Sequence, residues 1–586
     1  MTDLSSLDPV LTSIAAMMGA AVYLFAVTRG SALMMFFQQE EYDNARFVDW
    51  FREKRAFDTT ASFGLLIAVL WSGVMQSDLS ANMRESVPWL VFGPFVVFAI
   101  SLAAGAAKSV AAQKDNKKPL VRTDRVKRIL RTYYLLVLAS VAGALILASL
   151  GPHGSTYSVS YDASAAGWFD RLEFMNLSHD WRFAAFGLLT IAIIQALPFI
   201  GILANKLLEP AEERVKAKFR NEAVEKFNRL APKVVAITGS FGKTSTKHIL
   251  AHILEAAAPT LATPGSVNTE MGITRVIREQ LTPEHQYFIV EMGAYGPGSI
   301  ARLCRLTPPD VALVTAVGAA HYERFKTLET VAKAKFEIAE AVFKKGGKAV
   351  VSTDGIPAHL LSERMSAVEG DYIQVGGTGD IVLERYEITP DGLKIDVREQ
   401  EDKQTLQVPL FGEHQAGNIV VAAATARALG LPWSAIKGAL ATVPQIRYRL
   451  EVSKSTEAPT IINDAYNSNP IGFAAALECM DVLVDTGGRR ILVTPGMVEL
   501  GAIHDQEHER LGRLAAEHAD VVCVVTPDRI PTFVKGLEAA NDGSTTVMTF
   551  TTQDAAEAWV KNNWKSADVV LFENNLPDLY EAEVRF

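Results

Sequence analysis

Cysteine is scarce in this chain. Its 586 residues contain three cysteines, Cys304, Cys479 and Cys523, and none of them has a paired or C-x-x-C spacing. That excludes a four-cysteine zinc site and gives no sign of a disulfide framework, so we expect three buried thiols in a reducing compartment. A basic surplus is also missing, because the net charge is -9 and the pI is near 5.8. Nucleic-acid binders usually carry a basic surface, so we expect no nucleic-acid partner.

Charged residues are missing from five apolar stretches in the first third of the chain, 11–27, 61–75, 88–107, 133–150 and 183–204. A spanning helix needs about 20 apolar residues. Five such runs with charged loops between them favour five transmembrane helices over a buried helical core. No basic residue precedes the first run, which argues against a cleaved signal peptide. The lack of ionisable residues in the runs argues against an ATP-driven transporter, because transport paths usually carry them.

Lysine and arginine are distributed unevenly between these runs. Residues 1–10 contain none, and the four following loops contain five, one, nine and two, as the sequence shows. Cytoplasmic loops carry the excess of positive charge. The alternation places the N-terminus outside and, after five crossings, the rest of the chain in the cytoplasm, where ATP is found. We therefore expect a multi-pass protein of the cell membrane, in contact with the lipid bilayer.

The most informative stretch is Val234-Val-Ala-Ile-Thr-Gly-Ser-Phe-Gly-Lys-Thr-Ser-Thr246. A β-branched strand, a turn on Gly239 and Gly242, and a helix start form a cradle for phosphate. Backbone N–H groups and the helix dipole face the anion, Lys243 reaches the β- and γ-phosphates, and the Thr244 hydroxyl can hold Mg²⁺. Two residues separate the glycines, whereas the widespread P-loop has four. The sequence therefore predicts a nucleotide site with an unusual loop.

The organisation after the membrane region is α/β. Residues 206–232 are charged and favour a linker helix, and 233–446 and 447–586 form two further domains. Alternating strands and helices predict a parallel sheet with helices on both faces in the central domain and a second, Rossmann-like unit at the end. Asp391-Gly392 predicts a hairpin. The expected strands are 234–238, 287–291, 311–315, 348–352, 459–463, 490–494, 520–525 and 568–572, and the clearest helices are 244–257 and 329–343.

Further candidate residues lie near predicted strand ends. Glu291 closes the apolar strand Tyr287-Phe-Ile-Val-Glu291, where a carboxylate beside a phosphate cradle commonly holds Mg²⁺. His321 follows another strand, and a structural role and a metal or phosphate role are equally open for it. Lys335 lies on a predicted helix, where the residues alone give it no role. Asn418, Arg449 and Asp464 lie in segments that turn and loop chemistry alone also explains.

Taken together, these residues resemble the Mur ligase family, the ATP-dependent amide-bond ligases of peptidoglycan synthesis, most closely the type that adds D-alanyl-D-alanine (MurF). The resemblance covers Lys233 to the C-terminus. It rests on motifs that occur in family order, namely Thr238-Gly-Ser-Phe-Gly-Lys-Thr-Ser245, Asn268-Thr-Glu-Met-Gly272, Glu291-Met-Gly, His321-Tyr-Glu, Ala334-Lys335-Phe-Glu-Ile338, Gly412-x-His414-x-x-x-Asn418, Arg449, Asp464-Ala-Tyr-Asn-Ser-Asn-Pro470 and Met497-Val-Glu-Leu-Gly501.

The resemblance implies a role for each matching position. Lys243, Glu291, His321 and Lys335 would be catalytic, and Thr244, Glu291, His321 and Lys335 would serve two Mg²⁺ ions, Lys335 as a carbamate formed with CO₂. ATP would contact Gly239, Ser240, Phe241, Gly242, Lys243, Thr244, Ser245, Asn418, Arg449 and Asp464. Asn268, Thr269, Tyr466, Asn467 and Asn469 would lie on the substrate side.

The implied reaction has two steps. A substrate carboxylate attacks the γ-phosphate of ATP and gives an acyl phosphate and ADP, and an amine then displaces phosphate and forms the amide. The partners are therefore a carboxylate and an amine, as small molecules or peptides. Domain closure would bring the last domain onto the acyl phosphate and exclude water.

Two departures from the family pattern concern the substrates. Five apolar stretches stand where the family type has a small domain that grips UDP, which makes a lipid-linked acceptor plausible because anchoring raises its effective concentration. In the last domain, Thr494-Pro-Gly-Met and Phe572-Glu-Asn-Asn replace the Gly-Asp-Met and Lys-Gly-Ser patterns. Alternatives to a MurF-like ligase are a ligase for a poly-γ-glutamate or cyanophycin-type polymer and a degenerate ATP-binding regulator. Amidation of lipid-linked peptidoglycan is a further option, but family members that do this carry zinc-ribbon cysteines.

Overall fold

A computed structural model describes residues 9–40, 42–53, 56–75, 93–114, 119–150, 181–318, 325, 327–464, 470–498, 500 and 503–574. Two compact units divide the chain near Val215. The first is helical, and the second contains two β-sheets with helices packed against them.

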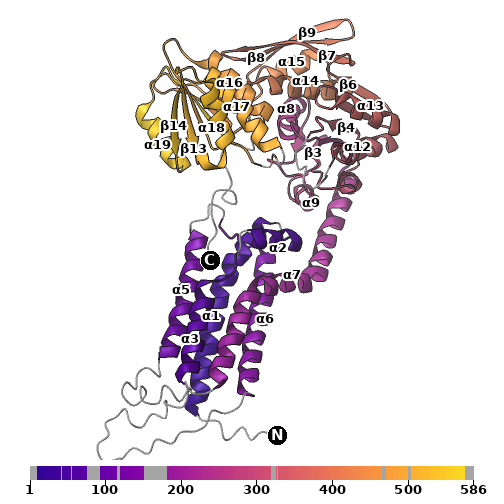
Figure 1. The fold of residues 1–586 in the computed structure, drawn as a ribbon. Coiled ribbons are helices and arrows are strands. Elements are labelled where there is room, and N and C mark those ends of the chain that lie inside the picture. Colours follow the sequence, from indigo (N-terminus) through magenta and orange to yellow (C-terminus); the bar gives the residue numbers. More distant parts are fainter. Residues whose placement is uncertain are drawn as a thin grey trace, which may run out of the picture. The chain divides into compact units, whose positions relative to one another are not determined.

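The first unit is a bundle of apolar helices (Figure 1). Helix α1 packs against α5 and α6, and α3 packs against α5. Their shared core includes Phe36, Phe47, Leu65, Tyr133 and Leu197. The described helices of this unit are α1 (Pro9–Gln39), α2 (Asn44–Glu53), α3 (Thr60–Met75), α5 (Gly93–Lys114), α6 (Asp124–Ser149) and the first part of α7 (Trp181–Leu230).

Four of these helices, α1, α5, α6 and α7, are long and apolar enough to cross a membrane. Helix α3 is apolar but has 16 residues, fewer than the ~17 to 25 of a typical span. Of the five transmembrane helices expected, the described part of the chain therefore contains four of spanning length, and α3 is a shorter apolar helix. Apolar side chains also cover the outside of the bundle, because Leu24, Phe63 and Leu135 are each at least 65% exposed. Helices that are apolar all round are typical of proteins surrounded by lipid.

Helix α1 continues well past the apolar stretch that predicted it. Arg29, counted above as a loop residue, lies inside α1 and is 3% exposed. Its Nη2 donates to the Ala56 carbonyl at 3.3 Å. Nearby, Asp58 Oδ1 accepts from the backbone N–H groups of Ala61 and Ser62 at the start of α3. The argument that the spans lack ionisable residues is therefore wrong for α1, and Arg29 is part of the structure at this end of the bundle.

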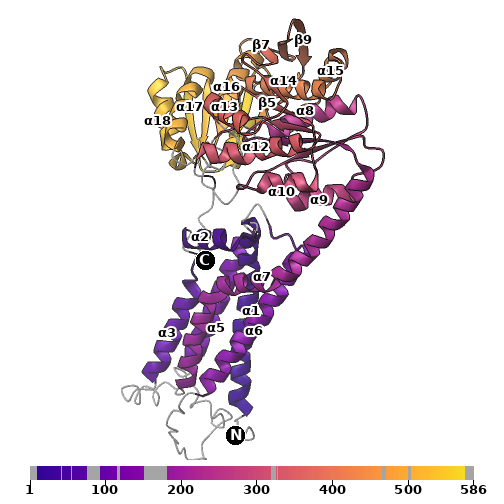
Figure 2. The same ribbon diagram turned by 90° about the vertical axis from the view of Figure 1, so that its right-hand side faces the viewer.

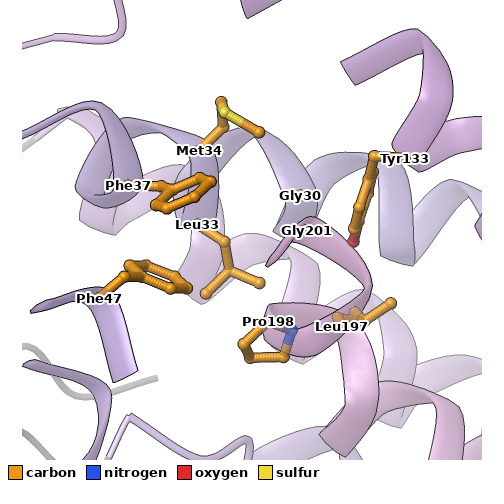
Figure 3. A pocket seen from close by; sticks show the side chains of 9 residues that line it. All are labelled: Gly30, Leu33, Met34, Phe37, Phe47, Tyr133, Leu197, Pro198 and Gly201. Carbon is orange, nitrogen blue, oxygen red and sulfur yellow. The ribbon is translucent and has the colours of Figure 1, made fainter. Parts of the chain in front are cut away.

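A small cavity lies in the core of this unit (Figure 3). Its volume is about 10 Å³, which is at the lower limit for one water molecule. The ring of Tyr133 lies against Gly30, and its hydroxyl donates to the Ala26 carbonyl at 3.1 Å. The cavity is too small for a substrate. It is lined by Gly30, Leu33, Met34, Phe37, Phe47, Tyr133, Leu197, Pro198 and Gly201.

Helix α7 is continuous from Trp181 to Leu230, so the last apolar stretch and the predicted linker helix form one element (Figure 2). It contains Pro198 and Pro210. Its final part belongs to the second unit, where Arg220 pairs with Glu270 at 2.6 Å and Arg278 pairs with Glu222 at 2.8 Å. The end of α7 is therefore held on α9 (Glu270–Glu279) by two ion pairs.

The larger sheet of the second unit has nine strands in the order β2-β3-β1-β4-β5-β6-β7-β8-β9. The strands up to β7 pair in parallel, and β7, β8 and β9 are antiparallel, with Gly392 at the predicted hairpin. The strands are β1 (Lys233–Thr238), β2 (Thr260–Ala262), β3 (Tyr287–Glu291), β4 (Val311–Val314), β5 (Lys348–Ser352), β6 (Tyr372–Val375), β7 (Ile381–Thr389), β8 (Gly392–Glu399) and β9 (Asp402–Val408).

Helices cover both faces of this sheet, as predicted. Alternate residues of β1 point to opposite faces, so Val234 and Ala236 join one core while Val235 and Ile237 join the other. The first face carries α9, α10 (Ser299–Leu306), α12 (Leu328–Lys344) and α13 (Ala358–Ala367). The second carries α8 (Lys243–Glu255), α14 (Glu413–Ala428) and α15 (Trp433–Leu440).

The smaller sheet has six strands in the order β10-β11-β15-β12-β13-β14, all parallel except β10. This confirms a second α/β unit with a Rossmann-like sheet. Its strands are β10 (Glu451–Ser453), β11 (Thr460–Asp464), β12 (Arg490–Thr494), β13 (Val521–Val525), β14 (Thr546–Phe550) and β15 (Val569–Glu573). Its helices are α16 (Pro470–Leu483), α17 (His504–His518), η7 (Pro527–Arg529), α18 (Pro531–Ala540) and α19 (Gln553–Asn563).

Candidate functional site

The predicted phosphate cradle lies between β1 and α8. The loop is pinned to the end of β4, because the Ser240 N–H donates to the Ala316 carbonyl at 2.8 Å and the Thr315 hydroxyl donates to the Phe241 carbonyl. Lys243 Nζ folds back and donates to the Gly239 carbonyl at 2.7 Å. These contacts hold the loop around the lysine, with the N-terminus of α8 beside it.

Glycine is required at both predicted positions of the loop. A Cβ at Gly239 would lie 1.9 Å from the Thr315 hydroxyl oxygen. At Gly242 the φ angle is +80°, and a Cβ would lie 2.4 Å from Asn418 Oδ1. Non-glycine residues rarely adopt such a φ. Both glycines therefore allow backbone and neighbouring side chains to approach more closely than any other residue would.

Glu291 is the centre of a buried polar cluster beside the cradle. Its side chain is 1% exposed. Oε2 accepts from the Thr244 hydroxyl at 3.1 Å and from Lys247 Nζ at 2.8 Å, while Oε1 accepts from Asn268 Nδ2 at 3.3 Å. The cluster brings together Thr244 and Glu291, which were both predicted to hold a metal, and adds Asn268, which was predicted on the substrate side. Lys247 was missed, although its position three residues after Thr244 places both on one face of α8.

The cluster suits one Mg²⁺ ion that arrives with a nucleotide. Mg²⁺ prefers oxygen ligands and is commonly bound by one or two carboxylates together with substrate phosphates. The Thr244 hydroxyl and the Glu291 carboxylate are hard oxygen donors in mutual contact, so they fit this ion. Among the described residues, no group of three or more His, Cys, Asp or Glu side chains forms a cage for a metal. Phosphate oxygens of a nucleotide are the kind of ligand that would complete such a site.

Lys335 lies on α12 and is 5% exposed. Burial lowers the pKa of its ammonium well below the usual value, and the positive charge of Lys243 lowers it further. No described residue forms an ion pair or a side-chain hydrogen bond with Lys335. The buried amine is therefore unusual for a lysine on a helix, and its lowered pKa favours the neutral form that can react with CO₂.

Four predicted site residues, His321, Tyr466, Asn467 and Asn469, lie outside the described residues. Thr269 is the N-cap of α9, and its hydroxyl accepts from the Gly272 N–H at 3.3 Å. Asn268 also accepts from the Tyr295 hydroxyl at 3.0 Å. The structure thus gives Thr269 a local structural contact and places Asn268 at the Glu291 cluster.

Asn418 lies near the N-terminus of α14 and contacts the phosphate-cradle helix. Its Oδ1 accepts from the Thr246 hydroxyl at 3.2 Å, and its Nδ2 donates to Gln415 Oε1 at 3.2 Å. Ser245 is buried on the same helix. The Asn418 side chain therefore packs against the phosphate loop and the start of α8. The family resemblance implies a different contact, with adenine.

Arg449 and Asp464 lie where the central domain passes into the last domain. Asp464 Oδ1 accepts from the Leu450 N–H at 3.0 Å. Burial raises the pKa of Asp464 to about 6, against the opposing effects of this hydrogen bond and of the Arg449 charge. Burial and the same arginine lower the pKa of His414 to about 4. The Arg449 charge therefore acts on titratable groups from both domains.

Comparison with protein families matches residues 237–426 to the Mur ligase middle domain and residues 448–573 to the Mur ligase glutamate ligase domain. The chain is 34% identical over 284 residues to the UDP-N-acetylmuramoyl-tripeptide–D-alanyl-D-alanine ligase of Escherichia coli, covering 48% of this chain and 62% of that one. It is 31% identical over 358 residues to the ligase of the same name from Mycobacterium tuberculosis, covering 58% and 69%. The matched region thus spans about two thirds of these relatives.

Solved structures of MurF ligases also resemble this chain. The MurF crystal structure from Acinetobacter baumannii aligns with a TM-score of 0.53 and 27% identity, over 61% of this chain and 77% of that chain. The MurF ligase from Thermotoga maritima in complex with ADP aligns with a TM-score of 0.53 and 27% identity, over 63% and 82%. That neighbour binds a nucleotide, as its complex shows.

Proposed function

Because this chain belongs to the Mur ligase family, we propose that it is an ATP-dependent ligase that forms an amide bond in cell-wall synthesis, with D-alanyl-D-alanine as the amine. The buried cluster of Thr244, Lys247 and Glu291 beside the open phosphate cradle carries the proposal. Such a cluster places a metal-binding carboxylate where nucleotide phosphates would lie.

The proposed reaction passes through an acyl phosphate. An oxygen of the substrate carboxylate attacks the γ-phosphorus of ATP, the bond to the β-phosphate oxygen breaks, and ADP leaves. The amine nitrogen then attacks the acyl carbon, inorganic phosphate leaves, and the nitrogen loses a proton. Mg²⁺ would neutralise charge on the transferring phosphoryl group.

The residues of this chain hold the reactants in place during both steps. Lys243 and the N-terminus of α8 would bind the phosphates, and Thr244 and Glu291 would hold the first metal. We assign a second metal to His321 and to Lys335 as its carbamate, which changes a buried amine into a carboxylate-like ligand. Arg449 and Asp464 would contact the nucleotide as the last domain closes over it.

We propose that the helical unit lies in a lipid bilayer and anchors the ligase unit on its cytoplasmic side, with the N-terminus outside. The long apolar helices, the apolar exterior of the bundle and the distribution of lysine and arginine support this. This orientation needs an odd number of crossings, so it requires the short helix α3 to complete one.

The acceptor is a peptide carboxylate, and the helical unit favours one linked to a membrane lipid over one linked to UDP. Anchoring both enzyme and acceptor in one membrane raises their effective concentration. A UDP-linked tripeptide is the acceptor named for the relatives. A ligase for another polymer would use neither acceptor.

An assay with paired substrates tests the proposal. The full-length protein in detergent is given ATP, a lipid-linked or UDP-linked tripeptide, and D-alanyl-D-alanine, and ADP release is measured. We expect release only when carboxylate and amine are both present, and a loss of about 100- to 1,000-fold for Lys243→Ala. The exposed lysine variant Lys233→Ala is the matched control and keeps full activity. ADP release that does not depend on the carboxylate or on the amine would contradict the proposal.

A further inference from the structure

Lys247 contacts the Glu291 carboxylate more closely than Thr244 or Asn268 does. It lies on α8 one helical turn after Thr244, and its Nζ is 2.8 Å from Glu291 Oε2. The exposed fractions of the two side chains are 5% and 1%. Lys247 Nζ also donates to the Gly265 carbonyl. A lysine is almost never so buried unless it is paired, and here its partner is Glu291.

Lys247 shares one oxygen of the Glu291 carboxylate with Thr244, the other residue expected to hold the metal. Glu291 Oε2 already accepts from the Thr244 hydroxyl at 3.1 Å and from Lys247, and Oε1 accepts from Asn268. A carboxylate has about four lone-pair sites for acceptance. Thr244 and Lys247 occupy both sites of Oε2, so a divalent cation that binds this oxygen must displace one of these two contacts.

Positive charge surrounds this single carboxylate. The charges of Glu291 and Arg449 both act on Lys247, whose Nζ lies 2.8 Å from Glu291 Oε2. Lys243 likewise feels both Glu291 and Arg449. Three cationic side chains thus act on one another around one anion. A bare divalent cation would be repelled there, whereas nucleotide phosphates would supply the missing negative charge.

We propose that Lys247 is a positioning residue that holds Glu291 in place of a divalent cation until a nucleotide binds, and that it makes metal binding depend on the nucleotide. The inference rests on the proposed function of the cradle. Binding then follows an order. Nucleotide phosphate enters before the metal or together with it, and Lys247 loses its contact with Glu291.

Binding of Mn²⁺ to the full-length protein in detergent tests this, with free Mn²⁺ measured by its paramagnetic resonance signal. We expect weak binding without nucleotide and much tighter binding with ADP. Lys247→Met, which keeps the length but removes the charge, should raise the nucleotide-free affinity by about 10- to 100-fold, the usual size of effects from neighbours of metal ligands. Adding Glu291→Gln to Lys247→Met should remove that gain, and Lys233→Met is the control for loss of a lysine outside the site.

Nucleotide-free binding by Lys247→Met that is as weak as in the wild type would overturn the inference. If this variant does not fold, a comparison of the wild type with Glu291→Gln still tests the inference. Nucleotide-free Mn²⁺ binding that Glu291→Gln abolishes would show that Lys247 does not block the site. Equal and weak nucleotide-free binding in wild type and Glu291→Gln supports the inference. Failure of the wild type to bind Mn²⁺ with ADP would instead contradict the proposed function.

Discussion

Asn418 Oδ1 lies 2.4 Å from the place where a Cβ would stand on Gly242. The same oxygen accepts from the Thr246 hydroxyl. An amide from α14 therefore occupies the space that a side chain in the phosphate loop would need. This contact joins the loop between β1 and α8 to a helix more than 170 residues further along the chain.

A double-mutant cycle between these two positions tests that contact. Gly242→Ala should weaken ADP binding and lower stability by about 1 to 3 kcal/mol, because it combines a positive φ with a steric clash. In an Asn418→Ala background the clash is gone, so Gly242→Ala should cost at least about 0.5 kcal/mol less. Isothermal titration with ADP and thermal unfolding measure both effects. Strict additivity would show that Asn418 does not limit the space at Gly242.

The buried amine of Lys335 should react with CO₂. Its lowered pKa favours the neutral form, whose nitrogen attacks the carbon of CO₂ while an N–H proton leaves to solvent. With isotopically labelled bicarbonate, the protein should show one carbamate carbon resonance, stronger at higher pH. The resonance should be absent from Lys335→Ala and retained in the neighbouring variant Lys333→Ala. An unchanged spectrum in Lys335→Ala would assign the carbamate elsewhere.

His508 should make the last domain sensitive to acid. It is fully buried, its Nδ1–H donates to the His504 carbonyl at 2.8 Å, and its Nε2 accepts from the Met497 N–H at 3.0 Å. Burial lowers the pKa of His508 from 6.5 to about 4. The unfolded state therefore binds a proton first as the pH falls. The stability due to neutral His508 is complete above pH 6.5 and is lost toward pH 4, by about 3 kcal/mol.

Chemical denaturation across this pH range measures the effect. His508→Gln should unfold more easily at neutral pH, because Gln does not replace both hydrogen bonds, and its stability should change less between pH 6.5 and 4. His504→Gln keeps the backbone carbonyl and is the matched control. A pH dependence of His508→Gln equal to that of the wild type would remove His508 as the cause.

The proposed orientation predicts which sites a membrane-impermeant maleimide can reach. Cysteine introduced at Ser544, in an exposed turn of the ligase unit, should react only after cells are permeabilised. Cysteine at Leu150, which is 77% exposed at the end of α6, should react in intact cells. Because all three native cysteines are buried, the wild type gives the background. Labelling of Ser544→Cys in intact cells would contradict the proposed orientation and indicate the opposite one.

The local pattern of apolar and polar residues was enough to predict much of the ligase fold. The strands β3, β5 and β12 begin and end where the sequence places them, because runs of β-branched residues between polar turns leave little freedom. The extent of helix α1 was not predictable in this way. Thr28, Arg29 and Ser31 end the apolar run but not the helix, since a buried contact with the Ala56 carbonyl accommodates the charge of Arg29.

The candidate site was predictable where a short sequence motif marks each residue. Thr244 and Glu291 follow from a helix start and a strand end, and the parallel register of β1 and β3 brings them into contact. Lys247 was not predictable because an isolated lysine on a helix usually faces water. Only the packing of α8 against the end of β3 shows that this lysine is buried on a carboxylate.

Transfer of oxygen from the acceptor to phosphate tests the central claim most directly. A peptide acceptor whose reacting carboxylate is enriched in heavy oxygen is incubated with the protein, ATP and D-alanyl-D-alanine, and the released phosphate is analysed by mass spectrometry. An acyl phosphate requires that one heavy oxygen appears in the phosphate for each amide formed, with Lys243→Ala forming neither product. Amide formation with unlabelled phosphate, or ATP hydrolysis without amide, would contradict the account.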